Sequence, residues 1–319
     1  MLSIWRLGAA LLCSLFMARA YASYPEKPIT LIVPFAAGSA TDSVARIVAD
    51  GLSKKLGQPV IVQTKAGAVG QIGTEYGARA APDGYTILMS TSGALAINPA
   101  LYKSTVRYDP IKDFDPIIMV GEVPFALVVN NKLPVSSIQD LRVYANKHPN
   151  RLSFAYASPT SQISSAIFMQ MADIHVISVA YKSSPQAVLD LIAGETQLYF
   201  IDYGTGLSHI KDGSIKALAV AGKKTSLLPS LPAISDTLPG FSITSWNGIL
   251  APHGTPADII TKLNYSIKQV LADPGIKSKL VAIGFEIDGT TSPEQFKNII
   301  KTDVKKWAQW IKQAGIKPH

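Results

Sequence analysis

The apolar positions of this chain follow two alternating spacings. A continuous apolar run from Ile29 to Val33 is typical of a buried strand. After a short loop, apolar residues recur at three- and four-residue intervals up to Leu56, and Gly57 directly after them predicts the end of a helix. Residues 29–56 therefore predict a strand, a tight loop and a helix, and similar units recur further along the chain.

The loop of this first unit is a candidate anion site. It carries Phe35 and Gly38, and the helix behind it starts with Ser39, Thr41 and Asp42. Ser39 and Asp42 have the three-residue spacing of a capping box. Unpaired backbone N–H groups at the positive end of a helix dipole attract a small anion. A Gly38 that serves only a tight turn would explain the loop equally well.

Polar loops follow several later strands. These strands are predicted at residues 85–89, 152–156, 176–181 and 197–201. The loops behind them carry hydroxyl groups, a lysine and an acid, and they complete the predicted ligand-binding set: Ser90, Thr91, Ser92, Ala94, Ser158, Thr160, Ser161, Tyr181, Lys182 and Asp202. Because ligands of parallel sheets bind beyond the carboxyl ends of the strands, we expect these loops to face one cleft.

Two long β-prone segments, residues 117–130 and 241–250, organise the chain into two lobes. Strands that alternate with helices predict parallel sheets joined by right-handed crossovers. We therefore expect an α/β protein in which residues 23–120 and 244–319 form lobe 1 and residues 121–243 form lobe 2. Each lobe is predicted as a mainly parallel sheet flanked by helices, with the ligand cleft between the lobes.

Residues 1–22 predict a cleaved signal peptide. A basic start is followed by an apolar stretch, residues 7–17, that is too short to span a bilayer. Motifs of the A-x-A type end at Ala20 and at Ala22, and we favour cleavage after Ala22 because it leaves a short polar lead into the first strand. A membrane anchor is the alternative. The one cysteine, Cys13, would leave with this segment, so the mature protein would contain no disulfide.

The composition limits the function classes. Hydrophobic residues make up 47% of the chain and charged residues 16%, which is typical of a globular protein. The net charge of +8 would suit nucleic acid, but export argues against it, and lysines spread over many segments indicate a solvated surface that steers anionic ligands. The five histidines are scattered without the spacing of metal ligands, so no metal is predicted.

Motifs for catalysis and cofactors are missing from the sequence. No G-x-S-x-G motif indicates a serine hydrolase, and Ser208 matches S-x-x-K without the partner motifs of that chemistry. Gly67, Gly70 and Gly73 have a G-x-x-G-x-x-G spacing, which differs from the dinucleotide-binding fingerprint. We therefore predict no cofactor and no enzyme activity, and a binding protein is the better interpretation.

A set of short motifs, in their order and spacing, carries a family resemblance. The set includes Tyr24-Pro25-x-Lys27-Pro28-Ile29, Val33-Pro34-Phe35-Ala36-Ala37-Gly38, Pro82-Asp83-Gly84-Tyr85-Thr86, Asn98-Pro99-x-Leu101, Ala180-Tyr181-Lys182, Leu250-Ala251-Pro252 and Ala314-Gly315-Ile316-Lys317. With these motifs the chain resembles the Bug/TctC solute-binding proteins over essentially its whole mature length.

The resemblance implies both a fold and a function. The fold would be that of two-lobed, type II periplasmic binding proteins, and the ligand would be a small organic carboxylate or amino acid. Such receptors hold a carboxylate through backbone N–H groups, hydroxyls and bridging waters, and they pass it to a tripartite tricarboxylate-type membrane transporter. The expected protein is a periplasmic monomer. A receptor for a membrane signalling system is one alternative, and a secreted hydrolase is another.

The sequence departs from the family pattern at several loop positions. Ser39 stands where the family usually has a second glycine, Thr64-Lys65-Ala66-Gly67 replaces an Asn-x-Pro-Gly motif, and Ser183 replaces a usual glycine. A glycine and a histidine that are usual after the third polar loop are absent around residues 158–165. These departures concern the choice of ligand, mainly on the lobe 2 side.

Asp202 has two competing interpretations. It follows a strand that should be buried, and it matches an acidic position of the family. An ionised aspartate only accepts hydrogen bonds, so it would favour a ligand ammonium or hydroxyl and disfavour a second ligand carboxylate. Alternatively, Asp202 caps the helix expected near Gly206 and does not contact the ligand.

Overall fold

The computed structural model describes residues 24–225, 227–313 and 316–318. The predicted signal peptide, its two cleavage motifs and Cys13 lie outside the described residues. Within the described ranges, no helix is both long enough and apolar enough to cross a membrane.

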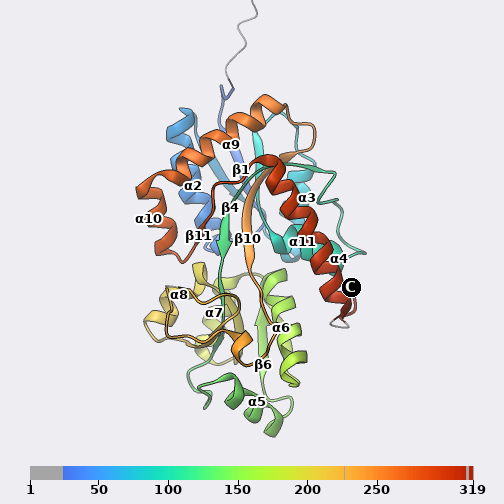
Figure 1. Ribbon diagram of the computed structural model, residues 1–319, viewed down its shortest axis with the longest axis vertical. Coiled ribbons are helices and arrows are strands. Elements are labelled where there is room, and N and C mark those ends of the chain that lie inside the picture. Colours follow the sequence, from blue (N-terminus) through green and yellow to red (C-terminus); the bar gives the residue numbers. More distant parts are fainter. Residues whose placement is uncertain (1–23, 226, 314–315, 319) are drawn as a thin grey trace, which may run out of the picture.

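A six-stranded sheet forms the upper half of the molecule in Figure 1. Its strands are β1 (Ile29–Val33), β2 (Val60–Thr64), β3 (Thr86–Thr91), β4 (Phe114–Val123), β10 (Ser245–Pro252) and β11 (Glu286–Ile287), in the order β11-β4-β10-β3-β1-β2. Strand β1 pairs in parallel with β2 and β3, whereas β10 runs antiparallel to β3 and β4. The helices of this half are α2 (Ala40–Leu56), α3 (Gln71–Ala78), α4 (Asn98–Leu101), α9 (Ala257–Ala272), α10 (Pro274–Ala282) and α11 (Pro293–Gln313).

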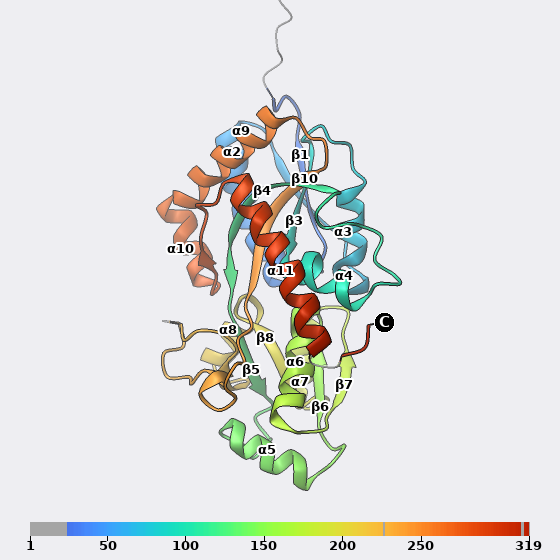
Figure 2. The ribbon, with the colours of Figure 1, turned by 45° about the vertical axis from the view of Figure 1, so that its right-hand side comes forward.

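A five-stranded sheet forms the lower half (Figures 1 and 2). Its strands are β5 (Phe125–Val129), β6 (Ser153–Tyr156), β7 (Ile177–Ala180), β8 (Leu198–Asp202) and β9 (Lys216–Val220), in the order β7-β6-β8-β5-β9. Strand β6 is parallel to β7 and β8, and β5 is antiparallel to β8 and β9. The helices of this half are α5 (Ile138–Lys147), α6 (Pro159–Ala172), α7 (Ser184–Ala193) and α8 (Tyr203–Lys211).

The chain passes between the two sheets in two places. Strand β4 ends at Val123 and β5 begins at Phe125, so only Pro124 separates the sheets there. The chain returns between β9 and β10, where Phe241 stacks on Phe200 of β8 with 5.7 Å between the ring centroids. Both rings are fully buried, so aromatic packing anchors the returning segment on the five-stranded sheet.

The predicted α/β class is confirmed, and both sheets are mixed: most strands of each sheet run in one direction, while β10 and β11 in one sheet and β5 in the other run against it. The antiparallel pairs all involve β5 or the strands β4 and β10. These strands belong to the segments that pass between the sheets. They are not joined to their neighbours by a crossover helix, which is the connection that makes strands parallel.

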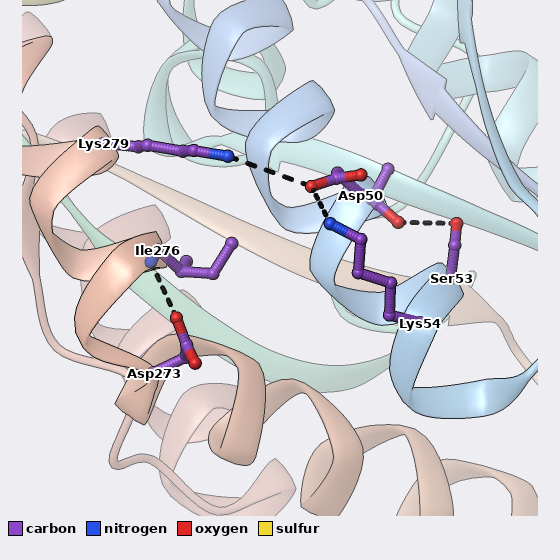
Figure 3. Close-up of polar contacts among 7 residues, drawn as sticks. Asp50, Ser53, Lys54, Asp273, Ile276 and Lys279 are labelled. Atoms are coloured by element: carbon purple, nitrogen blue, oxygen red, sulfur yellow. Dashed lines mark hydrogen bonds and ion pairs between the residues drawn. The ribbon is translucent and has the colours of Figure 1, made fainter.

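Helix α2 packs closely against α9 and α10 (Figure 3). Gly51 allows this approach, because a Cβ at that position would lie 2.5 Å from Val270 Cγ1. Around it, Asp50 Oδ2 accepts a hydrogen bond from Lys54 at 2.9 Å, and the Lys279 ammonium of α10 lies 3.9 Å from the same oxygen. Exposed ion pairs of this kind contribute little to stability. The position of α2 depends more on its buried face, which includes Val44, Val48 and Leu52.

Candidate functional site

A small cavity lies between the two sheets, and we call it the inner cavity. Its volume is about 40 Å³. The lining residues come from both halves of the molecule: Phe35, Ser39, Ala40, Thr41, Thr91, Val123, Phe125, Ser158, Thr160, Ser184, Asp202, Ser245 and Asn247. No lysine, arginine or histidine is among these described residues, so an anion there would meet N–H and hydroxyl groups but no cationic side chain.

The helices α2, α6, α7 and α8 begin at the inner cavity. Their N-cap residues are Ser39, Ser158, Ser183 and Asp202, and each side chain accepts a hydrogen bond from a backbone N–H of its own first turn. The N-termini of all four helices therefore lie around one small space, with α2 on one side and the other three on the opposite side. The positive ends of the helix dipoles and the remaining first-turn N–H groups favour a bound anion.

Asp42 organises the first loop and does not line the inner cavity. Its Oδ2 accepts hydrogen bonds from the Gly38 N–H at 2.9 Å and from Arg46 Nε at 3.0 Å, while Ser39 Oγ accepts one from the Asp42 N–H at 3.3 Å. The expected capping box is thus only half formed, because Asp42 reaches the N–H of Gly38 and not that of Ser39. Gly38 has a φ of 78°, in the left-handed region that favours glycine, and it lies outside the cavity lining as well.

The start of α6 contains a complete capping box made of two serines. The Ser161 N–H donates to Ser158 Oγ at 3.1 Å, and Ser161 Oγ accepts from the N–H groups of Ser158 at 3.0 Å and Ala157 at 3.1 Å. These bonds explain why Ser161 does not line the inner cavity, although it was predicted as a ligand residue. Ser158 and Thr160 do line it.

Strand β3 extends further than predicted. The expected end was Met89, but β3 continues to Thr91, because it pairs with β10 with Thr91 opposite Asn247 and Ser90 opposite Gly248. Alternation along the strand turns Thr91 toward the inner cavity and Ser90 away from it. Ser92 does not line the inner cavity itself, and its Oγ lies 2.9 Å from the Oγ of the lining residue Ser245.

Ala94 also lies outside the lining of the inner cavity. Its backbone is committed within the protein. The Ala94 N–H donates to Thr91 Oγ1 at 3.2 Å, and its carbonyl accepts a hydrogen bond of 2.5 Å from the Tyr108 hydroxyl. Ala94 therefore positions Thr91 and does not offer its N–H group to the cavity.

Strand β10 supplies two polar lining residues that were not predicted, Ser245 and Asn247. They occupy alternate positions of an otherwise apolar buried strand, so both face the same side of the sheet. This alternation is visible in the sequence Ser245-Trp246-Asn247-Gly248 and could have indicated a polar face. Ala40, Val123, Phe125 and Ser184 complete the lining residues that were not predicted.

Asp202 is the last residue of β8, and it both caps a helix and lines the inner cavity. Its Oδ1 accepts a hydrogen bond of 2.8 Å from the Thr205 N–H, so the expected capping occurs, although α8 begins at Tyr203, earlier than predicted. Burial raises the pKa of the Asp202 carboxyl above its ordinary value, and this effect outweighs that of the hydrogen bonds from Thr205, which lower the pKa. Asp202 is the one acid among the described residues of the lining.

A larger outer pocket of about 770 Å³ adjoins the inner cavity at Phe35, which lines both spaces. Tyr181 and Lys182 line this outer pocket and not the inner cavity. The remaining lining residues come from both halves: Pro34, Ala66, Gly67, Ala68, Val69, Gly70, Gln71, Tyr102, Thr105, Tyr156, Ala157 and Ala180.

The loop at the outer pocket has an unusual backbone. Ala68 and Val69 have φ angles of 46° and 49°, and a β-branched residue such as Val69 rarely adopts this region. Asn98 Nδ2 holds the loop by a hydrogen bond of 3.1 Å to the Val69 carbonyl. Strained backbone of this kind is concentrated at functional sites.

The two halves of the molecule touch at the rim of the site. A Cβ added to Gly93 would lie 2.9 Å from Thr160 Oγ1 on α6. The Tyr102 hydroxyl donates a hydrogen bond to Gln162 Oε1, also on α6. The two halves are therefore in direct contact on this side of the inner cavity.

Comparison with known proteins relates the chain to transport receptors. The model of the tripartite tricarboxylate transporter family receptor matches residues 44–316. The protein BugT of Bordetella pertussis is 35% identical over 304 residues, which cover 92% of this chain and 91% of BugT.

Solved structures lead to the same family. The periplasmic binding protein BugD is similar with a TM-score of 0.89 and 34% identity, over 93% of this chain and 100% of that chain. Rpa4515 of R. palustris, solved with adipate, has the same TM-score of 0.89, 34% identity and the same coverage of 93% and 100%. The predicted resemblance is confirmed, and the chain belongs to the family of tripartite tricarboxylate transporter receptors, the Bug/TctC solute-binding proteins.

Proposed function

We propose that this protein captures a small organic carboxylate between two lobes in the periplasm and delivers it to a tripartite tricarboxylate-type membrane transporter. The observation that carries the proposal is the convergence of four helix N-termini on an inner cavity lined, among the described residues, by no cationic side chain. Helix N-termini bind carboxylates without a salt bridge. The adipate bound to the similar protein Rpa4515 supports the same class of ligand.

In this proposal, residues 23–120 and 244–319 act as lobe 1 and residues 121–243 act as lobe 2. The passages between the sheets at Pro124 and between β9 and β10 support a division into two lobes. Gly121, Glu122 and Val123 pair with β10 in the six-stranded sheet, however, so lobe 1 extends to Val123 and does not end at residue 120. Ligand contacts would come from both lobes, with Ser39, Thr41 and Thr91 on one side and Ser158, Thr160 and Asp202 on the other. Phe35 would form an apolar wall, and Tyr181 and Lys182 would contact a longer ligand in the outer pocket.

The proposed activity is binding without turnover. A hydroxyl nucleophile needs an adjacent base, and neither a histidine nor a lysine is found among the described residues that line the inner cavity. Asp202 is committed to the Thr205 N–H through Oδ1. We therefore propose a receptor and not a hydrolase.

A thermal-shift screen of organic acids tests the proposal, on protein exported to and purified from the periplasm. A ligand at 100 times its Kd adds about 2.7 kcal/mol to the free energy of unfolding. In a protein of this size that raises Tm by roughly 5 °C.

N-terminal sequencing of the same sample shows whether export removes the segment up to Ala22.

Matched variants make the screen specific for the site. Thr160→Val removes one hydroxyl of the inner cavity at constant shape, and we expect it to reduce the ligand-induced rise in Tm. Thr261→Val changes a threonine of α9 outside the cavity and should keep the full rise. The proposal fails if no organic acid raises Tm, and hydrolysis of a carboxylate ester that is lost in Ser158→Ala would contradict the binding-only function.

A further inference from the structure

Asn247 is a buried polar residue of the inner cavity that the protein leaves unpaired. Its side chain is 1% exposed, and neither Nδ2 nor Oδ1 has a hydrogen-bond partner among the described residues. On the sheet it lies opposite Thr91 of β3 and Gly121 of β4. Gly121 has no side chain, and the Thr91 hydroxyl accepts its hydrogen bond from the Ala94 N–H. Neither neighbour therefore satisfies the amide.

An unpaired amide at this depth is unusual in a folded protein. Native structures leave few buried polar groups without a partner, because each such group loses its hydrogen bonds to water. Asn264 of α9 shows the ordinary arrangement, since its Nδ2 donates to the carbonyls of Ile117 at 2.8 Å and Thr291 at 3.1 Å. Asn247 differs from Asn264 in that it lines the inner cavity, so a hydrogen-bond partner for its amide would lie in that cavity.

We propose that Asn247 binds the ligand directly and that, together with Asp202, it selects a ligand whose inner end carries a hydrogen-bond donor beside an acceptor. This inference rests on the proposed function and adds to it a contact residue and a ligand class. The amide offers a donor at Nδ2 and an acceptor at Oδ1, whereas an ionised Asp202 offers acceptors alone. An α-hydroxy acid or an α-amino acid satisfies both residues, because its hydroxyl or ammonium donates while its carboxylate accepts.

The other lining groups do not impose this requirement. The Ser245 hydroxyl is already paired with Ser92 at 2.9 Å, and a hydroxyl can in any case either donate or accept. An unsubstituted dicarboxylate offers acceptors alone, so Oδ1 of Asn247 would stay unpaired and the second charge of the ligand would face Asp202. No cationic side chain among the described lining residues would offset that repulsion.

The experiment compares matched acids on the exported protein and on Asn247→Leu, which has a similar volume and no polar atoms. The probes are three sets of equal chain length: propionate, lactate and alanine; succinate, malate and aspartate; glutarate, 2-hydroxyglutarate and glutamate. Isothermal titration calorimetry measures each Kd. Within the set that binds best, we expect the substituted acids to bind the wild-type protein about tenfold more tightly than the unsubstituted acid, and Asn247→Leu to reduce that ratio to near one.

The protein without ligand gives a second readout. Leucine removes two unpaired polar atoms, so the Tm of free Asn247→Leu should equal or exceed that of the wild type. The matched control is Asn264→Leu, which removes an amide that is paired with two carbonyls. This control should lower Tm and keep the wild-type ratio of affinities.

The outcomes separate the inference from the proposed function. The inference is overturned if Asn247→Leu keeps the wild-type ratio of affinities, or if the wild type binds substituted and unsubstituted acids equally well. If Asn247→Leu does not fold, Asn247→Ser carries the same comparison, because its shorter side chain withdraws from the ligand. If no acid binds the wild type at all, the proposed function itself fails.

Discussion

Gly204 and Ala40 meet across the gap between the two sheets, so closely that a Cβ added to Gly204 would lie 2.5 Å from the Ala40 Cβ. Gly204 is in the first turn of α8 and Ala40 is the first residue of α2. Gly204 is not among the glycines with a positive φ, so its backbone would accept another residue. The close approach of the two helices therefore requires glycine at this position.

Gly204→Ala should prevent full closure of the lobes and weaken ligand binding by about tenfold or more. The Tm of the free protein should not fall, because alanine favours a helix over glycine by about 1 kcal/mol. Calorimetry measures the affinity, and small-angle scattering measures the radius of gyration. The wild type should become more compact with ligand, and Gly204→Ala should not.

The double variant Ala40→Gly/Gly204→Ala is the control for this prediction. It removes the Ala40 Cβ but leaves the Ala40 Cα 3.0 Å from the added Cβ, so we expect partial recovery of affinity and compaction. Wild-type affinity and compaction in the single variant would show that binding does not need this contact.

Phe35→Ala should lower ligand affinity more than it lowers stability. The Phe35 ring lines both the inner cavity and the outer pocket, and it is only half-buried. Its loss therefore removes an apolar wall of the site while taking little from the core. Phe35→Leu, which keeps most of the apolar volume, should retain more affinity. A fall in Tm with unchanged affinity would identify Phe35 as an ordinary packing residue.

Asp202→Asn should change which ligands are preferred. Asparagine caps helices as well as aspartate does, so the hydrogen bond from the Thr205 N–H should persist and the fold should be kept. Without the negative charge, ligands with an ammonium or hydroxyl should bind more weakly, and dicarboxylates should bind equally or more tightly. Calorimetry on both classes measures the ranking, and an unaltered ranking would remove Asp202 from the ligand site.

The stability of the free protein should depend on the charge of Asp202. Burial raises the pKa of this carboxyl above its ordinary value of 3.8. A group whose pKa is higher in the folded state binds its proton more tightly there, so its contribution to stability is present below 3.8 and is lost as the pH rises through the folded pKa. The difference in Tm between Asp202→Asn and the wild type should therefore grow in favour of the variant as the pH rises from acid to neutral. A difference that stays constant over that range would contradict a buried, desolvated carboxylate.

Local features were predictable from the sequence because local interactions determine them. The unit of β1, loop and α2 follows from an apolar run, a helical repeat, Ser39 at the start and Gly57 at the end. The capping by Asp202 also depends on residues three positions apart. The family motifs are local as well, and the comparisons confirm the family that they indicated.

Long-range contacts decided the extent of the strands, the order of the sheets and the set of residues that line the inner cavity. Strand β3 reaches Thr91 only because β10, from the far end of the chain, pairs with it, and that antiparallel pairing makes the six-stranded sheet mixed. In the five-stranded sheet, the antiparallel pairing of β5 with β8 and β9 has the same effect. The polar alternation of Ser245 and Asn247 is written in the sequence, but the face on which it lies depends on the sheet that receives β10. Likewise, nothing local to Gly204 indicates that Ala40 will lie against it. The sequence by itself determined the helices, the strands and the polar character of the loops that follow the strands, because helix caps and the spacing of apolar residues depend on positions only a few residues apart. The tertiary structure alone decided which hydroxyls, which amide and which acid meet in one cavity, because contacts between distant segments bring them there.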